Sequence, residues 1–385
     1  MKIADEWVTL DATQAVFSML EDAGYQALFV GGCVRNALLD APVKDIDIAT
    51  DAHPEAVIKL AKAAGLKSVP TGVDHGTITV VSDRTPHEIT TFREDVETHG
   101  RHAVVAYASD VVQDARRRDF TMNALYADRR GQVIDPLGGL ADLEARRVRF
   151  IENPDQRITE DYLRILRFFR FHAWYGDPSG GLDADALAAV AGHLDGLDSL
   201  SRERVGSEMT RLLAAPDPAP SVAAMQSVGV LQRILPGAQD VALAPLVHLE
   251  QQAGFAPDAI RRLAALGGQE VAERLRLSNA EARLLDRLRQ YVGTATPAIE
   301  LGYREGEGTG QSVLLLRAAL LDTPFDPEDM RRVAEGVTAQ FPVVAADLMP
   351  ALSGPDLGQK LRELEALWLA SDCVMTRDQL LQSGH

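Results

Sequence analysis

The chain has 385 residues and a formal net charge of −17, and 46% of its residues are hydrophobic while 25% are charged. This length predicts two or three domains, and the composition is that of a globular protein. No apolar run reaches the length of a membrane span, the first residues lack a secretory signal, and two distant cysteines form neither a disulfide framework nor a metal motif. We therefore expect a cytoplasmic protein with no membrane attachment.

The negative charge is distributed unevenly along the chain. Residues 101–170 contain 13 arginines, no lysine and 11 acidic residues, a local balance of 13 − 11 = +2. The remainder therefore carries −17 − 2 = −19. A negative sum disfavours a nucleic-acid partner, but arginines concentrated in one cleft can bind phosphate on an otherwise acidic body. The alternative is that the local sequence simply has helix faces rich in Arg and Glu.

The first elements lead to a glycine turn. Residues 11–23 predict an amphipathic helix, and residues 27–30 predict a short buried strand. Gly31 and Gly32 follow at once, ahead of apolar residues with helical spacing. A strand, a glycine turn and a helix N-terminus form a place where backbone N–H groups can bind phosphate, and Arg35 adds a positive charge. The alternative is an ordinary turn.

The next stretch carries two aspartates. Residues 44–49 alternate between polar and apolar, which predicts a strand with Asp45 and Asp47 on one face. Neighbouring carboxylates repel each other unless a cation lies between them, and Mg²⁺ binds such oxygens together with substrate phosphates. A lone D-x-D is often a solvated loop or strand edge. Shortly after a glycine turn, however, it is the arrangement that metal-assisted nucleotidyl transfer needs.

Further strand signals follow the aspartates. We expect a helix over residues 54–64, paired strands over 76–81 and 87–92, and a flexible polar loop over 94–104. Glu88 lies in the second strand, where a third carboxylate could complete a metal site or orient a nucleophile. The alternative is a surface residue of that strand.

Residues 116–125 predict a helix that places Asp119 and Asn123 four residues apart on one face. With Arg118 they could hold a ribose hydroxyl and a phosphate, whereas the alternative is a capped, charged helix N-terminus. A short strand is expected over residues 132–135. Beyond about residue 150 the pattern is helical, so we expect an α+β architecture in which a mixed head precedes a long helical part.

Residues 160–171 predict a helix on which Asp161, Arg164, Arg167 and Arg170 recur every three residues along one stripe. Three arginines on one stripe favour an anionic partner. Asp161 beside Arg164 offers an acceptor next to planar donors, which could read the hydrogen-bonding edge of a base. The alternative is that these arginines pair with Asp and Glu elsewhere in the chain.

Together these segments resemble the motifs of the class II bacterial CCA tRNA nucleotidyltransferase and poly(A) polymerase family, in the family's order. The matching motifs lie between about residues 25 and 215: GGCVRNALL, KDIDIAT, RRDFTMNAL, DPLGG, EDYLRILRFFRF and LSRERV. The resemblance implies a polymerase-beta-like nucleotidyltransferase head over residues 1–150, with a small mixed sheet and helices. It implies a helical neck over 151–215 for base recognition and RNA binding, and a helical body and tail over 216–385 that bind tRNA.

The resemblance also implies the reaction, which is addition of C, C and A to the tRNA 3′ end from CTP and ATP without a nucleic-acid template. Asp45 and Asp47 would hold two Mg²⁺ ions, and Glu88 would be a third catalytic carboxylate. The helical body would bind the tRNA acceptor arm by shape and backbone charge. The nucleotide-binding residues would be Gly31, Gly32, Arg35, Arg118, Asp119, Asn123, Asp161, Arg164, Arg167 and Arg170.

Two features separate the activities within the family. Poly(A) polymerases typically carry a basic-aromatic segment where this chain has TGVDHGT, residues 71–77. Enzymes that add only CC are shortened between Phe92 and Val104, where this chain is of full length. The resemblance therefore implies full CCA addition rather than poly(A) synthesis, CC-only addition or A-only addition. Asn36 departs from the family, in which most members have Asp.

Two further alternatives come from other functional classes. A helical RNA-binding module with an inactive head is disfavoured by the intact D-x-D. A nucleotidyltransferase for small molecules is disfavoured by the long arginine-bearing helical half.

Overall fold

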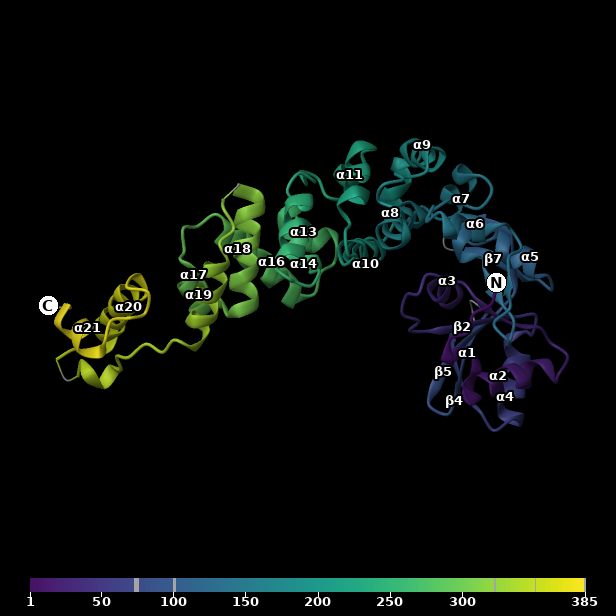
Figure 1. Cartoon of the computed structure of the whole chain (residues 1–385), viewed down its shortest axis with the longest axis horizontal. Helices are drawn as coiled ribbons and strands as arrows, with labels where there is room; N and C mark the ends of the chain where they lie inside the picture. The colour runs from purple at the N-terminus through teal and green to yellow at the C-terminus, as the bar shows by residue number, and fades with distance from the viewer. Residues whose placement is uncertain (73–75, 100–101, 322, 350, 384–385) are drawn as a thin grey trace. The chain divides into compact units, whose positions relative to one another are not determined.

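The structure is a computed structural model that describes residues 1–72, 76–99, 102–321, 323–349 and 351–383. It consists of two compact units (Figure 1). Unit 1 is made of Met1–Glu208 and Pro220–Arg233, and unit 2 is made of Met209–Ala219 and Ile234–His385. Within the described ranges, no helix is long and apolar enough to cross a lipid bilayer.

Unit 1 is built on a seven-stranded mixed sheet with the order β3-β4-β5-β2-β1-β8-β9. Neighbouring strands are antiparallel, except that β2 and β5 run parallel. The strands of the sheet are β1 (Ala27–Val30), β2 (Ile46–Thr50), β3 (Lys67–Gly72), β4 (Thr77–Ser82), β5 (Thr85–Thr91), β8 (Tyr126–Ala127) and β9 (Val133–Ile134). The predicted small mixed sheet is confirmed, and β3 is a strand that the sequence pattern did not predict.

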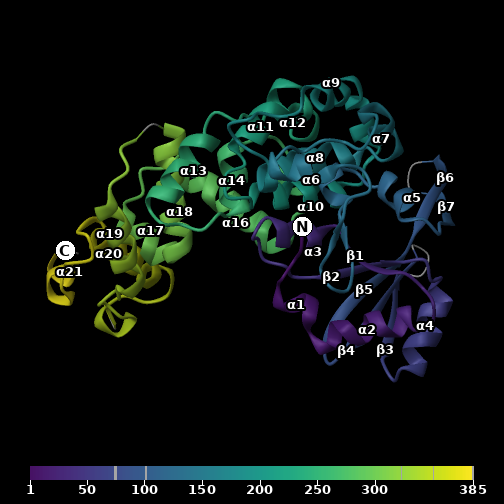
Figure 2. The same ribbon diagram turned by 45° about the vertical axis from the view of Figure 1, so that its right-hand side comes forward.

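The helices of the amino-terminal part surround this sheet, and α2 and α4 pack on it (Figure 2). Their bounds are α1 (Glu6–Thr9), α2 (Asp11–Glu21), α3 (Gly32–Leu38), α4 (Pro54–Ala63), α5 (Val111–Arg116), the short 3-10 helix η2 (Thr121–Asn123) and α6 (Gly139–Glu144). The α2 and α4 helices agree with the predicted ones apart from their last residues.

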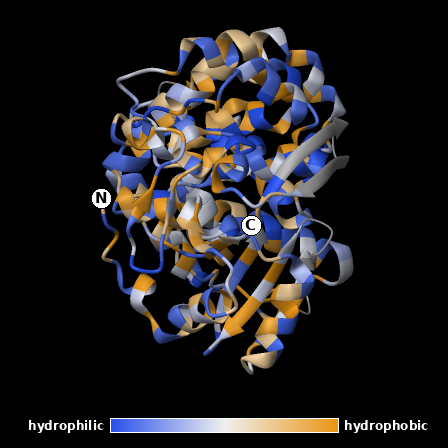
Figure 3. Ribbon diagram, turned by 90° about the vertical axis from the view of Figure 1, so that its right-hand side faces the viewer, coloured by the Kyte–Doolittle hydropathy of each residue, from blue (hydrophilic) through white to orange (hydrophobic). Residues whose placement is uncertain are grey.

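Strand alternation divides the side chains of the sheet between two faces, and α2 packs on one of them. Phe17 of α2 packs on Phe29 of β1, with ring centroids 4.4 Å apart, and Phe29 pairs across from Ile48 of β2. Ile48 is therefore buried on the side of α2, and Asp47 next to it points to the other face. Figure 3 shows that hydrophobic and hydrophilic residues are interspersed along the ribbon.

The predicted flexible loop over residues 94–104 is wrong, because this region forms a hairpin. Strands β6 (Arg93–His99) and β7 (His102–Tyr107) pair antiparallel as a separate two-stranded sheet beside α5 (Figure 2). The ladder satisfies backbone N–H and C=O groups that a loop would leave to water. The polar sequence of the first half suggested a loop, but HAVVAY in the second half has strand propensity.

The predicted helix over residues 116–125 is also wrong. Helix α5 ends at Arg116, and Phe120 adopts extended backbone with φ −122° and ψ 148° before η2 begins. Phe120 is fully buried against Phe150 and Phe171, with ring centroids 5.0 Å from each, and its backbone bridges Phe150. Burial of this large ring outweighs the weak local preference for helix.

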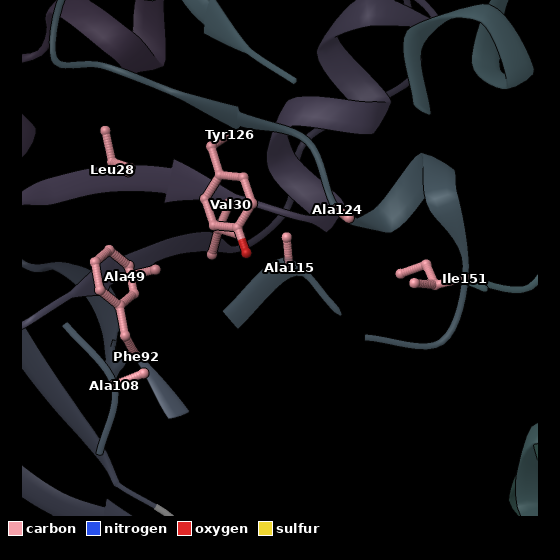
Figure 4. Close-up of a cluster of buried hydrophobic side chains, with 9 residues drawn as sticks. All are labelled: Leu28, Val30, Ala49, Phe92, Ala108, Ala115, Ala124, Tyr126 and Ile151. Atoms are coloured by element: carbon pink, nitrogen blue, oxygen red, sulfur yellow. The ribbon is translucent and has the colours of Figure 1, made fainter. Parts of the chain in front are cut away.

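A hydrophobic cluster fills the space between the sheet, the hairpin root and α5 (Figure 4). Tyr126 is fully buried there, and its hydroxyl donates a hydrogen bond to Asp114 and accepts one from Arg118. The cluster consists of Leu28, Val30, Ala49, Phe92, Ala108, Ala115, Ala124, Tyr126 and Ile151.

The rest of the described chain contains helices and no further strand after β9, which confirms the predicted helical part. Its α-helices are α7 (Pro154–Glu160), α8 (Leu163–Tyr175), α9 (Ala184–Gly192), α10 (Arg202–Leu213), α11 (Ala219–Ser227), α12 (Val230–Ile234), α13 (Leu243–Gln252), α14 (Ala259–Leu266), α15 (Val271–Arg274), α16 (Asn279–Val292), α17 (Ala298–Glu305), α18 (Glu307–Leu321), α19 (Pro327–Thr338), α20 (Gly354–Ala370) and α21 (Arg377–Ser383). Two 3-10 helices are η3 (Leu194–Ser199) and η4 (Ala345–Asp347). The division into head, neck and body stays a prediction.

Within unit 2, helices α17 and α19 cross at very short range. A Cβ atom added at Gly302 would collide with the backbone oxygen of Val333, and one at Gly336 would collide with the backbone oxygen of Ile299. Only glycine allows the two backbones to approach this closely, so the pair packs as one block.

Replacing Gly302 with alanine should lower the free energy of unfolding of unit 2 by about 1–3 kcal/mol, because the added methyl group forces the backbones apart. Gly308 of α18 is the matched control, because a Cβ there meets no atom within 4 Å. Gly308→Ala should be neutral or stabilise the helix by about 0.5–1 kcal/mol. Urea unfolding followed by circular dichroism compares the two variants, and equal effects would contradict the close-packing explanation.

Candidate active site

Three carboxylates lie close together on the sheet face opposite α2, on and just before the interior strands β2 and β5. Asp47 of β2 and Glu88 of β5 are register partners on the parallel strands, and Asp45 precedes β2 by one residue. Asp45 and Glu88 are exposed, whereas Asp47 is half-buried. No side chain of the described residues donates a hydrogen bond or forms an ion pair with any of these three carboxylates. The register pairing of β2 and β5 places Glu88 beside Asp47.

The pKa of the Asp47 carboxyl is raised to about 6. Burial is the largest cause, and the negative charges of Glu88 and Asp45 add to it, while Arg118 and Arg35 act in the opposite direction. Such a concentration of negative charge favours a bound cation.

The donor set fits a hard divalent cation that takes part of its coordination from a ligand. The described residues contain no cluster of three or more Asp, Glu, His or Cys side chains close enough to hold a metal by themselves. A site of this kind offers one or two carboxylates and leaves the remaining positions to water and phosphate oxygens. Asp45 and Asp47 are the residues that would hold the ion.

The glycine turn lies directly beside an arginine. Gly31 has φ +67° and ψ −115°, a backbone conformation that residues with a Cβ rarely adopt, and Gly32 opens α3. A Cβ at Gly31 would lie 3.2 Å from Nη1 of Arg118 and 3.6 Å from the backbone oxygen of Asn123. The Gly31 N–H donates to the Leu125 carbonyl at 3.0 Å, so this particular N–H is already used.

Arg118 is held along one edge of its guanidinium. Its Nε and Nη2 donate to Oδ2 of Asp114 at 3.2 and 2.9 Å, and its Nε also donates to the Tyr126 hydroxyl at 3.1 Å. Nη1, the nitrogen next to Gly31, has no protein partner within the described chain. Arg118 is therefore a fixed positive group with one free edge at the glycine turn.

Arg35 is 6% exposed and is bound by neutral groups. It donates to Oδ1 of Asn123, to the Tyr175 hydroxyl at 2.9 Å and to Oδ1 of Asn36 at 2.8 Å, and its guanidinium lies 4.0 Å from the Tyr175 ring centroid. Burial lowers the pKa of Arg35. Asn36 also donates to the Pro42 carbonyl at 2.9 Å, a bond that an aspartate could not make.

Asp119 and Asn123 are joined, although not through the predicted helix. Asn123 Nδ2 donates to Oδ1 of Asp119 at 2.8 Å, and Nε and Nη2 of Arg167 donate to Oδ2 at 2.7 and 2.5 Å. Burial by itself would raise the pKa of Asp119, but Arg167 and Asn123 outweigh it and lower the pKa to about 2. Asp119 is therefore ionised at neutral pH.

The same connections extend along α8 to α10. Arg170 Nε donates to Oε2 of Glu208 at 2.5 Å, and Nη1 of Arg167 lies 4.0 Å from Oε1. One continuous set of contacts, here called the arginine chain, thus joins six residues. Its members are Arg35, Asn123, Asp119, Arg167, Glu208 and Arg170.

Asp161 and Arg164 lie at a break between two helices, which corrects the single predicted helix. Helix α7 ends at Glu160, and Asp161 has extended backbone with φ −153° and ψ 104°. Asp161 Oδ2 accepts from Arg204 at 2.7 Å, and Arg164 donates to Glu160 and to the Arg117 carbonyl. Each of the two side chains is thus held by other residues of the chain, and their use in base recognition stays a prediction.

The alternative explanation of the arginine stripe is therefore correct in part, because Arg164, Arg167 and Arg170 each pair with a carboxylate. Sequence reasoning missed four residues of the site: Asp114, Tyr175, Arg204 and Glu208. Asp114 had a signal, since it stands four residues before Arg118 at the spacing of an ion pair on a helix. The other three are distant in sequence from the groups that they contact.

The chain matches two known protein families. Residues 27–149 match the family described as the poly A polymerase head domain. Residues 181–241 match the family described as the probable RNA and SrmB-binding site of polymerase A.

Similar proteins cover most of the chain. The mitochondrial CCA tRNA nucleotidyltransferase 1 of Mus musculus is 30% identical over 96% of this chain and 89% of its own length. The CCA-adding enzyme of Streptococcus pyogenes serotype M3 is 41% identical over 54% of this chain, which spans about half (51%) of that relative. The crystal structure of the Bacillus stearothermophilus CCA-adding enzyme in complex with CTP has 29% identity and a TM-score of 0.72, over 93% of this chain and 91% of that chain.

In the metal-free protein, the Asp47 carboxyl should titrate near pH 6 rather than near its ordinary pKa of about 3.9. Because the folded state binds this proton more tightly, the group by itself lowers stability as the pH rises from about 4 to about 6. Glu88→Gln removes a neighbouring negative charge and should lower the midpoint. Carbon-13 NMR of the labelled Asp47 carboxyl measures the titration midpoint in the unaltered protein and in the Glu88→Gln variant.

Glu21→Gln is the control. Glu21, the last residue of α2, pairs with Arg129 and does not contact the site. It should leave the Asp47 midpoint unchanged. A midpoint near 4 in the unaltered protein would contradict the proposed charge crowding.

Gly31→Ala should destabilise unit 1 by about 1–3 kcal/mol through backbone strain, with a further loss from crowding against Arg118. Gly24 separates the two effects, because it has φ +85° but a Cβ there meets no atom within 4 Å. Gly24→Ala should therefore cost less in urea unfolding. Equal losses of unfolding free energy in the two variants would show that the Arg118 side chain moves aside at the glycine turn without an energetic cost.

Proposed function

This chain belongs to the family of CCA tRNA nucleotidyltransferases, and on that basis we propose that it adds C, C and A to the 3′ end of tRNA from CTP and ATP. The observation that carries the proposal is the group of three carboxylates, Asp45, Asp47 and Glu88, on and just before interior strands of a mixed sheet, to which no described side chain donates a hydrogen bond. The similarity to named CCA-adding enzymes over almost the whole chain supports the same conclusion.

The reaction is nucleotidyl transfer. The terminal 3′ oxygen of the tRNA forms a bond to the α-phosphorus of the nucleotide, the bond to the β-phosphate breaks, and pyrophosphate leaves with its electron pair. The hydroxyl proton passes to a base, and Glu88 beside Asp47 is the carboxylate best placed to accept it or to orient the hydroxyl.

Members of this family depend on divalent metal ions, and we assign Mg²⁺ to Asp45 and Asp47. When bound, Mg²⁺ stabilises negative charge on the phosphates and makes the attacking hydroxyl more acidic. The raised pKa of Asp47 agrees with a pair of carboxylates that is completed by a cation.

The triphosphate is proposed to lie against the glycine turn. Gly31 and Gly32 bring the backbone close, and Nη1 of Arg118 faces the turn with no protein partner within the described chain. Arg35 is buried, so its role is to hold α3 against α8 and to supply positive charge from behind the turn rather than to touch the phosphates.

Ribose selection is proposed to use Arg118 directly, with Asp119 and Asn123 behind it. Asp119 already accepts four hydrogen bonds, from the Phe120 N–H, Asn123 and two nitrogens of Arg167. A carboxylate has about four acceptor positions, so a ribose hydroxyl must replace one of these donors to bind Asp119.

Base selection is proposed to use Asp161 and Arg164. The Asp161 side chain is 34% exposed and keeps acceptor positions beside its bond to Arg204. Arg164 uses Nη1 and one N–H of Nη2 for internal bonds, which leaves N–H donors on the same planar group. Arg167 and Arg170 support α8 through the arginine chain, and the helical body is assigned to the tRNA acceptor arm. A cytoplasmic location stays a prediction.

The decisive test uses end-labelled tRNA that lacks CCA, incubated with Mg²⁺ and each nucleotide alone, then with both. Growth by two nucleotides with CTP and by three with CTP plus ATP is the expected result. Stalling at two would indicate a CC-only enzyme, and a long ladder with ATP alone would indicate a poly(A) polymerase.

Two variants connect this activity to the site. Asp47→Asn should lower the rate by at least roughly 100-fold, because loss of several kcal/mol of charge stabilisation has an effect of this size. Asp51→Asn is the matched control: Asp51 follows the other end of β2 and accepts the Gln26 N–H at 2.7 Å. It should keep nearly full activity, and equal loss in both variants would contradict the assigned site.

A further inference from the structure

Beyond the residues named so far, we infer that Asp114 is a positioning residue that holds Arg118 at the glycine turn and connects it to the root of the β6–β7 hairpin. This inference deepens the proposed function and rests on it. Asp114 itself is 1% exposed and lies behind Arg118 on α5, so it does not touch a nucleotide.

The first argument is the number of donors that converge on this single carboxylate. Oδ2 accepts from Arg118 twice and from the Tyr126 hydroxyl at 2.8 Å. Oδ1 accepts from Arg117 Nε at 3.0 Å and from the Arg93 backbone N–H at 3.4 Å. These donors outweigh the effect of burial and lower the pKa of Asp114, so the group stays ionised.

The second argument is the geometry of the guanidinium group. It is planar and rigid, so fixing Nε and Nη2 on Asp114 also fixes the direction of Nη1. Nη1 is the nitrogen that lies beside Gly31, 3.2 Å from the place of a Cβ atom there. If the Asp114 carboxylate loses its charge, Arg118 can rotate away from the turn or pair with the unpaired carboxylates instead.

The third argument is the position of Arg93. Strand β6 begins at this residue, and its backbone N–H donates to the same carboxylate that holds Arg118. Phe92, just before it, forms backbone hydrogen bonds with Thr50 of β2 and with Ala108, the residue after β7. Asp114 therefore contacts both the first residue of the hairpin and Arg118.

If Asp114 had a purely structural role, its loss would lower stability without a specific effect on nucleotide binding. Asp142 is a suitable comparison, because it is also a buried carboxylate of unit 1 that pairs with an arginine, Arg149, at 2.8 Å. It has no contact with Arg118. Loss of either carboxylate removes a buried ion pair, but only Asp114 should affect nucleotide binding.

The experiment measures CTP binding by calorimetry and the KM for CTP in the tRNA extension assay. Asp114→Asn should raise both the CTP dissociation constant and KM about tenfold or more, with a much smaller change in the KM for tRNA. Asp114→Glu keeps the charge and should restore part of the affinity. Asp142→Asn should lower the melting temperature without changing the CTP dissociation constant.

A double variant tests the route of the effect. Asp114→Asn combined with Arg118→Lys should bind CTP no more weakly than Arg118→Lys alone, because Asp114 acts through Arg118. Additive losses would overturn the inference, as would unchanged CTP affinity in Asp114→Asn. If the unaltered protein binds CTP but does not extend tRNA, the proposed function fails while the binding data still decide the role of Asp114; no CTP binding at all would overturn both.

Discussion

The fixed geometry of guanidinium–carboxylate pairs is the constraint on which the rest of this site depends. In unit 1, nearly every buried acid next to the site is matched by an arginine: Asp114 by Arg118, Asp119 by Arg167 and Glu208 by Arg170. Buried charges must be compensated, so the first pair fixes Arg118 at the end of α5, and the other two hold the segment before η2 and helix α10 against α8. Asp45, Asp47 and Glu88 differ from these acids, because no described side chain donates a hydrogen bond to them, and a bound cation would supply the missing positive charge.

The sheet and the arginine chain contribute different things to the proposed chemistry. The parallel pairing of β2 and β5 places Asp47 and Glu88 side by side through backbone hydrogen bonds, which leaves their side chains free. The arginine chain positions basic groups through their side chains, which uses up most of their donors. The carboxylates of the strands thus keep their acceptor positions for a ligand, whereas the arginines are already oriented by hydrogen bonds. This arrangement suits a reaction centre with a cation and a polyphosphate.

Much of the fold could be predicted from local pattern, whereas the partners of individual side chains could not. Alternation over residues 44–49 and 76–81 predicted strands correctly, because the period of two is set by burial on one face. Phe120 broke the predicted helix because a distant aromatic cluster decided its backbone, and the partners of Arg167 and Arg170 lie 48 and 38 residues away. The family motifs did include every member of the arginine chain except Glu208, because a motif records which residues recur without recording what each one contacts.

Asn36 has a consequence for how the site responds to ionic strength. Within the described chain Arg35 is bonded only to neutral groups, among them the Asn36 amide, so its charge is not cancelled at contact distance. Dissolved ions screen exposed charges over about 10 Å at 0.1 M salt but screen buried ones much less. The attraction that Arg35 exerts on a polyphosphate should therefore persist in concentrated salt, while the contribution of exposed arginines to RNA binding fades.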